Sequence, residues 1–513
     1  MSTQFAPHSM GPGPSGIRLG EILPESRVIG STSVTVTSCC GRWDECQPQD
    51  LYVAIMDAEH DGHDYVAEAV ERGAKAIVTE RYLATKVPQF IVEDTRQAYG
   101  QICQALVGLP SQRLTTIGVS GTDGKTITTH LIRSILRAAE LEAGLVSSIE
   151  NGVETDGPNT MNAPLIANQL AHMVLGGCTH GVVEMPSIAL ARHAMSGVSL
   201  DVAVLTNIRQ DHMQFHGSKE NYLNAKTRVL DFLKPTGFAV MNADDPTTHF
   251  LLDKIDTPTL TIGIKQEAEV TARVIESNSM DQSFLISAGT ETVAVRSTMI
   301  GLQHVYNSLT AAAVALTMGI DLSTIARGIE SCSSIPGRLE RVDCGQDFGV
   351  WIDSARSPGQ LANAIQAIRK VTKGKVWCIG SIDENQSANQ RHRMGEILDR
   401  AADKSVITRA DVIQIADFEP AHQFLDGYRK PGTAQLIPDR FEAINWTLAQ
   451  AKPGDSVLVT GCGERAFARL SDEWTVSDRH VCEVWLYDQS GLGQTNAVEF
   501  DAHDIYRIDD YRD

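Results

Sequence analysis

The stretch Thr115-Thr-Ile-Gly-Val-Ser-Gly-Thr-Asp-Gly-Lys-Thr126 decides the fold of the domain that contains it. Its first half is an apolar strand pattern, and a helical pattern follows from Thr128. A strand, a glycine loop and a helix in this order form a phosphate cradle, because glycines let backbone N–H groups point at phosphate oxygens. The sequence therefore predicts a nucleotide site at the loop residues Gly121, Thr122, Asp123, Gly124, Lys125 and Thr126.

Two side chains of this loop carry the expected chemistry. Lys125 would neutralise charge on the β- and γ-phosphates, and the hydroxyl of Thr126 would bind Mg²⁺. Val119 stands where the general phosphate-loop pattern has a glycine, so the loop is a shorter variant of that pattern. The alternative is a glycine turn before a core helix, and the Gly-Lys-Thr sequence in this context argues against it.

Strand and helix patterns alternate along the whole chain, which predicts an α/β protein of three domains. Runs such as Asp201-Val-Ala-Val-Leu-Thr lie between helical runs, as in a doubly wound, mainly parallel sheet. The predicted parts are a flexible tail over 1–18, a small N-terminal α/β domain over 19–112, a central doubly wound phosphate-loop domain over 113–336, a C-terminal Rossmann-like domain over 337–490 and an acidic tail over 491–513.

Composition excludes several classes of protein. The 513 residues carry a formal net charge of −20 and no long basic run, which argues against a nucleic-acid partner. No apolar run is long enough to span a membrane, and the first residues do not form a signal peptide. The ten cysteines include no Cys-x-x-Cys pair, so we expect free thiols in a reducing compartment, the cytoplasm. We expect a monomer.

A second block carries a family resemblance. Thr206-Asn-Ile-Arg-Gln-Asp-His-Met-Gln-Phe-His-Gly-Ser-Lys-Glu-Asn-Tyr-Leu-Asn-Ala-Lys226 resembles the Mur ligase family, because six fixed features recur at the family's spacing. The resemblance implies an ATP site with two Mg²⁺ ions, held by Thr126, by Glu184 at a strand end, by His212 and by a carbamylated Lys226. It further places Asn307 near the adenine, with His304 where the family usually has Asn, and it brings Arg338 and Asp353 to the nucleotide. Lys125, Lys226 and Arg338 would be the catalytic residues. A surface ion pair is the alternative for Arg338 and Asp353.

The arrangement looks most like the MurE branch of the family, whose N-terminal domain binds a UDP-sugar. The resemblance implies two substrates, a UDP-N-acetylmuramoyl-peptide and an amino acid, in peptidoglycan synthesis. The candidate substrate-binding residues are Ser38, Asn162, Ser187, Arg192, Arg391, Gly461 and Glu464.

The departures from this branch concentrate in the substrate regions. The usual Glu-Val-Ser-Ser-His-Ala-Leu reads Glu184-Met-Pro-Ser-Ile-Ala-Leu190, and Arg192 stands two places early. Ala410-Asp-Val-Ile413 lacks the arginine that binds diaminopimelate, and the Gly-Lys-Gly-His-Glu element reads Gly461-Cys-Gly-Glu-Arg465. The amino acid that is added therefore stays open.

The implied chemistry is ATP-driven amide formation through an acyl phosphate. Three hypotheses follow. The first is a ligase that acts on a UDP-muramoyl peptide. The second is a Mur-derived ligase for another carboxylate and amine. The third is an ATP-binding paralogue with little catalysis, which the altered C-terminal motifs favour and the retained Lys226 disfavours.

Overall fold

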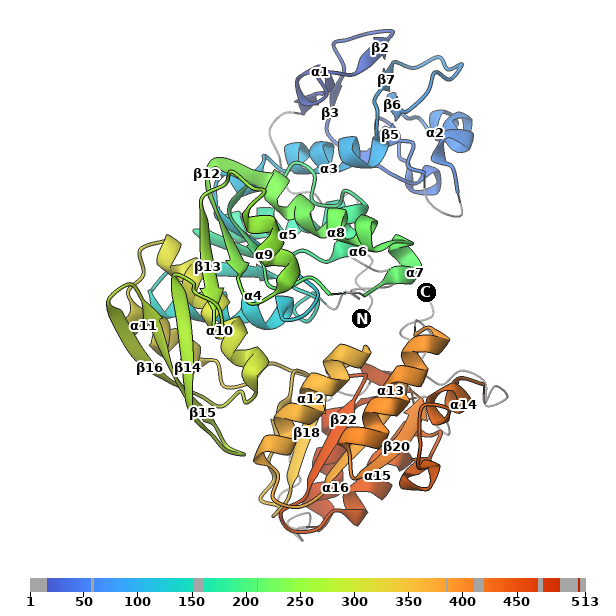
Figure 1. Cartoon of the computed structure of the whole chain (residues 1–513). Coiled ribbons are helices and arrows are strands. Elements are labelled where there is room, and N and C mark those ends of the chain that lie inside the picture. Colours follow the sequence, from blue (N-terminus) through green and yellow to red (C-terminus); the bar gives the residue numbers. More distant parts are fainter. Residues whose placement is uncertain are drawn as a thin grey trace. The chain divides into compact units, whose positions relative to one another are not determined.

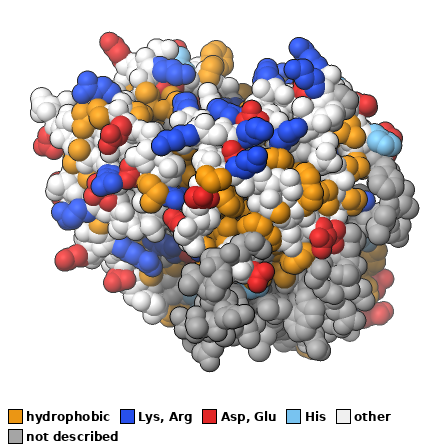
Figure 2. Space-filling model, turned by 90° about the horizontal axis from the view of Figure 1, so that it is seen from below, with side chains coloured by type: hydrophobic (Ala, Val, Ile, Leu, Met, Phe, Trp, Pro, Cys, Tyr) orange, Lys and Arg blue, Asp and Glu red, His pale blue; other side chains and the backbone are white. Residues whose placement is uncertain are grey.

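The computed structural model describes residues 16–56, 60–151, 161–209, 211–383, 386–409, 419–468, 474–489 and 506–507. The chain forms two compact units. The first is built from residues up to Val270 together with Thr310–Gly328, and the second from Thr271–Leu309 and from Ile329 onward. Among the described residues, no helix is both long and apolar enough to cross a membrane. Acidic and basic side chains are interspersed on the face drawn in Figure 2.

The first unit begins with a small five-stranded sheet of order β2-β7-β6-β5-β4. Four of its strands are parallel, and β2 runs antiparallel to β7. The α3 helix starts because the carboxylate of Asp94 accepts a hydrogen bond from the Gln97 N–H at 2.9 Å. The elements are β1 (Ile17–Arg18), α1 (Leu19–Ile22), β2 (Arg27–Ile29), β3 (Thr35–Val36), β4 (Cys39–Cys40), β5 (Leu51–Val53), α2 (Val66–Glu71), β6 (Ala76–Thr79), β7 (Gln89–Ile91) and α3 (Thr95–Leu106).

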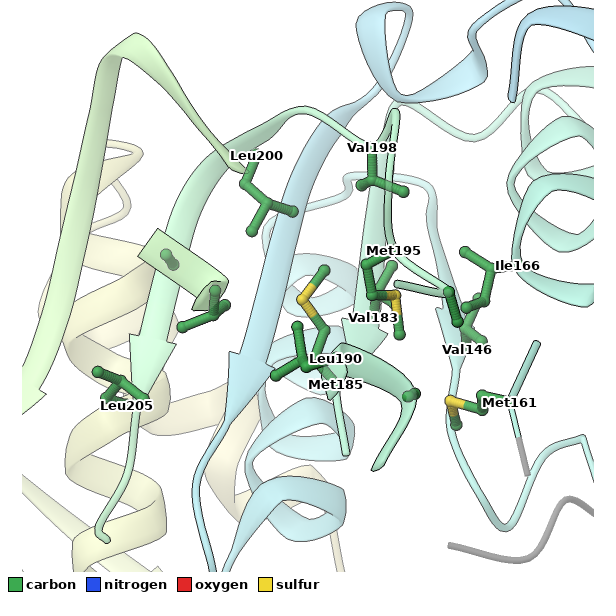
Figure 3. Close-up of a cluster of buried hydrophobic side chains, with 14 of the residues drawn as sticks. Val146, Met161, Ile166, Val183, Met185, Leu190, Met195, Val198, Leu200 and Leu205 are labelled. Atoms are coloured by element: carbon green, nitrogen blue, oxygen red, sulfur yellow. The ribbon is translucent and has the colours of Figure 1, made fainter. Parts of the chain in front are cut away.

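The same unit continues into a parallel sheet of order β13-β12-β11-β8-β10-β9. Figure 1 labels β12 and β13 of this sheet. Alternate residues of its strands face opposite sides, so Val183 of β10 and Met185, directly after this strand, join one buried cluster (Figure 3). The strands and helices are β8 (Thr115–Ser120), α4 (Lys125–Ala138), β9 (Ala143–Val146), α5 (Ala163–Leu175), β10 (His180–Glu184), α6 (Ser187–Ala191), β11 (Leu200–Leu205), α7 (Met213–His216), α8 (Lys219–Thr227), β12 (Leu233–Asn242), α9 (Pro246–Leu252) and β13 (Thr259–Gly263).

The second unit includes an antiparallel β segment and a six-stranded sheet of order β17-β18-β22-β19-β20-β21. Helices α12, α13 and α14 bury one face of this sheet, and α15 and α16 bury the other. Only β17 is antiparallel among its described pairs. The elements from residue 270 onward are β14 (Val270–Ser277), β15 (Gln282–Ala288), β16 (Glu291–Ser297), α10 (Leu302–Thr317), α11 (Leu322–Ser331), β17 (Glu340–Val342), β18 (Gly349–Asp353), α12 (Pro358–Val371), β19 (Val376–Ile382), α13 (Ala388–Ala401), β20 (Lys404–Arg409), α14 (Glu419–Leu425), β21 (Ala434–Leu436), α15 (Arg440–Gln450), β22 (Ser456–Thr460), β23 (Ala466–Ala468), β24 (Trp474–Ser477), α16 (Asp478–Gln489) and β25 (Tyr506–Arg507).

Candidate active site

The phosphate loop joins the end of β8 to the start of α4. Two of its glycines have backbone conformations that L side chains rarely adopt, with φ of 146° at Gly121 and 85° at Gly124. A Cβ atom at Gly121 would also lie 1.9 Å from the hydroxyl of Thr206. The sequence therefore needs glycine at both positions, and α4 begins at Lys125 as a phosphate cradle requires.

The segment that follows β11 holds this loop in place. The hydroxyl of Thr206 donates to the Asp123 carbonyl at 2.7 Å. The Asn207 amide both accepts from the Asp123 N–H and donates to its carbonyl, each at 3.0 Å. The Thr122 N–H donates to the Asn207 carbonyl at 2.8 Å. The loop is thus shaped by the protein itself and is arranged to receive a nucleotide.

A set of oxygen atoms lies beside the loop. Glu184 ends β10, the neighbour of β8, and its carboxylate is almost fully buried. It accepts a hydrogen bond from the hydroxyl of Thr126 at 3.0 Å and bonds from the N–H and hydroxyl of Ser148 at 3.1 and 3.3 Å. A carboxylate and a hydroxyl at the start of a helix are ligands that Mg²⁺ accepts. These residues therefore fit the expected metal.

Lys226 is brought to the same loop from α8. Its side chain is 1% exposed, and its ammonium group donates to the Gly121 carbonyl at 2.5 Å. The nitrogen lies 4.7 Å from the centre of the Tyr222 ring, whose hydroxyl is 2.8 Å from that of Thr122. The structure thus joins the two sequence blocks at the carboxyl ends of the parallel strands, where ligands bind in open α/β sheets.

His212 occupies the turn before α7. Its backbone is left-handed, with φ of 53°, and its ring lies 3.4 Å from the carboxylate of Asp211. Nearby, the buried ring of His216 is 3.1 Å from the hydroxyl of Ser187. Burial lowers the pKa of His216 to about 4, and the electrostatic effects of neighbouring His212 and Lys226 act in the same direction. The imidazole of His216 is therefore neutral near pH 7.

The other substrate candidates of the first unit occupy separate places. The Ser38 hydroxyl donates to the buried carboxylate of Asp50, in the N-terminal sheet. Asn162 caps α5 by accepting from the Leu165 N–H at 3.0 Å. The guanidinium of Arg192 lies 5.4 Å from the centre of the Phe215 ring. Ser187 and Arg192 thus both contact the Thr206–Lys226 block, Ser187 through His216 and Arg192 through Phe215.

The second unit brings Arg338 and Asp353 to the end of its sheet. The Arg338 guanidinium donates to Glu464 at 2.8 Å. Asp353 ends β18, and its carboxylate accepts the N–H groups of Leu339 and Ala355 at 2.8 and 2.9 Å. Burial raises the pKa of Asp353 to about 6, against the opposing effects of the Arg338 charge and of these two hydrogen bonds.

The remaining candidates of this unit surround Asp383, which directly follows β19. The Gly461 carbonyl accepts from Nε of Arg356 at 2.9 Å. Arg391 donates to the Asp383 carbonyl at 3.2 Å. Both Arg356 and Arg465 face the Asp383 carboxylate, at 3.7 and 3.6 Å. The sequence motifs did not single out Asp383, Arg356 or Arg465 as site residues, because three different loops bring them together.

On α10, His304 and Asn307 are buried, and among described residues the His304 Nδ1 and Asn307 Nδ2 atoms have no hydrogen-bond partner. Burial lowers the pKa of His304 to about 4. Unsatisfied buried polar atoms of this kind are costly without a ligand or water, which agrees with an expected place beside a nucleotide base. The stretch Ala410–Ile413, where the family resemblance leads us to expect the choice of amino acid, lies outside the described residues.

Comparison with known proteins identifies the family. The Mur ligase middle domain matches residues 119–315, and the Mur ligase, glutamate ligase domain matches residues 337–463. The UDP-N-acetylmuramoyl-L-alanyl-D-glutamate–2,6-diaminopimelate ligase of Geobacillus thermodenitrificans (strain NG80-2) is 35% identical over 83% of this chain and 89% of its own. The ligase of the same name from Bacillus licheniformis is 31% identical over 86% and 93% of the two chains.

Solved structures agree on the fold. A UDP-N-acetylmuramoyl-L-alanyl-D-glutamate–2,6-diaminopimelate ligase has a TM-score of 0.67 at 21% identity, over 93% of this chain and 99% of that chain. The MurF ligase from Thermotoga maritima in complex with ADP has a TM-score of 0.61 at 19% identity, over 89% and 98%.

The chain therefore belongs to the Mur ligase family, and it is an ATP-dependent ligase that forms amide bonds. Within the family it is MurE-like, since these relatives by sequence carry the name of that ligase. The expected family, the three-domain α/β fold class and the ligase activity are confirmed.

Proposed function

We propose that this protein joins an amino acid to a UDP-N-acetylmuramoyl-peptide, as a cytoplasmic monomer that serves peptidoglycan-precursor synthesis. One observation carries the proposal: Glu184, Thr126 and Lys226 converge on a phosphate loop that the protein's own hydrogen bonds hold in shape. A paralogue that binds ATP without catalysis would not need a buried lysine beside an acidic metal site. The names and length coverage of the sequence relatives support the same substrates.

Four residues would hold the two Mg²⁺ ions, namely Thr126, Glu184, His212 and a carbamylated Lys226. Carbamylation would turn a buried cation, which repels a metal, into an oxygen ligand of opposite charge. The ions held by these residues would supply positive charge against the phosphates during transfer.

The residues of the chain would then guide two chemical steps. Lys125 would orient the γ-phosphate of ATP while a substrate carboxylate attacks it, so that ADP leaves and an acyl phosphate forms. Arg338 would offset the charge on the transferred phosphate. The amine of the amino acid would next attack the acyl carbon, forming the C–N bond, losing a proton and releasing phosphate. Asp353 and Asn307 would position the nucleotide.

The substrates would meet the other candidate residues. Ser38, Asn162, Ser187 and Arg192 would contact the UDP-muramoyl part, and Arg391, Gly461 and Glu464 the amino acid. The corresponding domains would span 19–112, 113–336 and 337–490, with tails at 1–18 and 491–513.

The test measures phosphate release from ATP in the presence of UDP-N-acetylmuramoyl-L-alanyl-D-glutamate, with hydroxylamine as the amine. Hydroxylamine intercepts an acyl phosphate as a hydroxamate whatever the amino-acid pocket prefers. We expect hydroxamate with the wild type and none with Lys125→Ala, whereas Lys219→Ala, which alters an exposed lysine of α8, should behave as wild type. Absence of hydroxamate with this and related UDP-muramoyl substrates would refute the proposal and favour another substrate or a non-catalytic role.

A further inference from the structure

Two thiols and one carboxylate come together on one face of the N-terminal sheet. Cys40 ends β4, Cys46 directly follows the short helix η1 (Trp43–Glu45), and Asp50 directly precedes β5. Each of the three residues is 1–2% exposed, and their sulfur and carboxylate oxygen atoms all lie within 4.8 Å of one another. None of them takes part in the chemistry proposed above, so their close approach calls for a separate explanation.

The register of the sheet explains how these side chains meet. Strands β4 and β5 are parallel, and Cys40 lies opposite Tyr52. Alternate residues along a strand share a face, so Asp50 belongs to the face of Tyr52 and Cys40. The Cys46 N–H donates to the Trp43 carbonyl at 3.2 Å, and Cys46 packs with Cys40 and Tyr52 in one buried cluster. The fold therefore presents two sulfur atoms and a carboxylate to one place.

The Asp50 carboxylate has no cationic partner among the described residues. One of its oxygens accepts the Ser38 hydroxyl, and the other accepts the Gln47 N–H at 2.8 Å. Both donors are uncharged, and an ionised carboxylate offers about four lone pairs. A buried charge is costly unless it is paired or binds a metal. The carboxylate of Asp50 can therefore accept a cation, and its burial favours one.

The two thiols make long contacts with backbone carbonyls. The Cys40 sulfur lies 3.8 Å from the Leu51 oxygen, and the Cys46 sulfur lies 3.8 Å from the oxygens of Gln47 and Ala69. The hydrogen bond with Cys46 and then burial raise the pKa of the Cys40 thiol. A metal that binds here must therefore displace the thiol protons, as metals do when they bind cysteine.

Two sulfur atoms and a carboxylate form a donor set that suits zinc. Cysteine sulfur is a usual zinc ligand, whereas Mg²⁺ and Ca²⁺ take oxygen ligands. Bonds of about 2.3 Å to sulfur and about 2.0 Å to oxygen place tetrahedral ligand atoms about 3.5–3.8 Å apart. Donor atoms that lie within 4.8 Å would need to approach by about 1 Å. The Ser38 and Gln47 hydrogen bonds would orient the carboxylate, as partners behind a metal ligand do.

We propose that Cys40, Cys46 and Asp50 bind one Zn²⁺ ion, with a water molecule as the fourth ligand. The ion would join the end of β4, the segment after η1 and the start of β5. The spacing Cys-x5-Cys-x3-Asp is not a paired-cysteine pattern, which is why the sequence led us to expect free thiols. The site uses other residues and another metal than the phosphate loop, so it does not depend on the function proposed above.

Titration of the reduced, metal-stripped full chain with Zn²⁺, against a colour-forming chelator, measures stoichiometry and affinity. We expect one ion per chain, with release of one proton from each thiol. Cys46→Ser should weaken binding by at least roughly 100-fold, because loss of a partner behind a metal ligand alone costs about 10–100-fold. The control Cys103→Ser alters another buried thiol, 3.9 Å from the Cys39 sulfur, and should bind as wild type. Equal affinities of the two variants, or wild type that binds no stoichiometric zinc, would overturn the proposal.

Cobalt in place of zinc reports the ligands directly. Co²⁺ bound through thiolates absorbs in the near ultraviolet by charge transfer. This absorption should appear in wild type, weaken in Cys46→Ser and persist in Cys103→Ser, while Asp50→Asn should keep the absorption but bind the metal more weakly. Its absence from wild type would overturn the proposal even if Cys46→Ser failed to fold.

Thermal unfolding gives a readout that does not require a ligand spectrum. Circular dichroism establishes that each variant is folded before metal is added. Zinc should raise the melting temperature of wild type and of Cys103→Ser but not that of folded Cys46→Ser, since a ligand stabilises the state that binds it. An equal rise in all three proteins would place the metal elsewhere and overturn the proposal.

Discussion

Replacing Arg440 by glutamine should destabilise the second unit far more than an ordinary ion-pair loss. Arg440 donates twice to the Asp478 carboxylate, at 2.7 Å each, and the side chains are 2% and 0% exposed. The same guanidinium donates to the Thr460 carbonyl at 2.8 Å and the Ser381 hydroxyl at 3.2 Å. It therefore joins α15, α16, β19 and β22 in one buried network.

The magnitude follows from the burial of the pair. Removing one partner leaves a charge without compensation in the interior, which costs about 3–5 kcal/mol. For a unit of this size, each kcal/mol shifts the melting temperature by about 2–4 °C, so Arg440→Gln should lower it by about 6–20 °C. Arg369→Gln offers a matched control, because Arg369 and Asp403 pair at 2.6 Å with side chains 39% and 42% exposed. Exposed pairs contribute about 0–1 kcal/mol.

Thermal unfolding followed by tryptophan fluorescence measures both variants under the same conditions. The double variant Arg440→Met with Asp478→Leu removes both charges and should recover much of the loss, since apolar replacement of a whole buried pair is often neutral. The reasoning fails if Arg440→Gln melts within about 3 °C of Arg369→Gln, or if the double variant is less stable than the single one.

Three more outcomes test the site. Gly121→Ala should weaken ATP binding, measured by calorimetry, by at least roughly 100-fold, because the added Cβ would collide with Thr206. The control Gly359→Ala should bind ATP normally, because no atom lies within 4 Å of a Cβ at that position. Equal affinities of the two variants would contradict this reasoning. The folded-state pKa of Asp353, about 6, lies above the unfolded value near 4, so this carboxyl contributes stability that is lost as pH rises from about 4 to 6. The difference in melting temperature between wild type and Asp353→Asn should therefore shift against wild type over this range; a difference that does not change with pH would exclude that carboxyl. Lys226→Arg keeps the positive charge of an unmodified lysine but cannot be carbamylated, so we expect this variant to bind ATP and to lose turnover. With ¹³C-bicarbonate, only wild type should give the NMR signal of a carbamate. Turnover of the variant at the wild-type rate would argue against the carbamate.

The sequence predicted the elements of the nucleotide site better than its contacts. A strand, glycine loop and helix can be read from one continuous stretch, and β8 and α4 follow that pattern. The block from Thr206 to Lys226 pointed to the same site because its spacing is specific. The contacts between atoms are not visible in the sequence. Ser148 and Glu184 are 36 positions apart, and the parallel order of the strands brings them together.

The charge cluster around Asp383 was harder to predict for a physical reason. Arg356, Asp383 and Arg465 lie on loops after three strands, and the order β18-β22-β19 brings those loops together. Sequence motifs consist of residues that lie close together in the chain. A charge cluster whose members come together only through the order of the strands therefore matches no such motif. The Ser187–His216 contact is similar, because each residue follows a different strand.

The close approach of the Thr206 hydroxyl to Gly121 also has a consequence for protein engineering. The nucleotide loop is specified by two pieces of sequence 85 positions apart, since Asp123, Thr206 and Asn207 form one hydrogen-bonded module. A chimera that borrows residues 115–131 from a distant ligase inherits half of that module. Successful recombination should therefore exchange both pieces together, and crossovers placed between them should yield chains that fold but do not hold ATP.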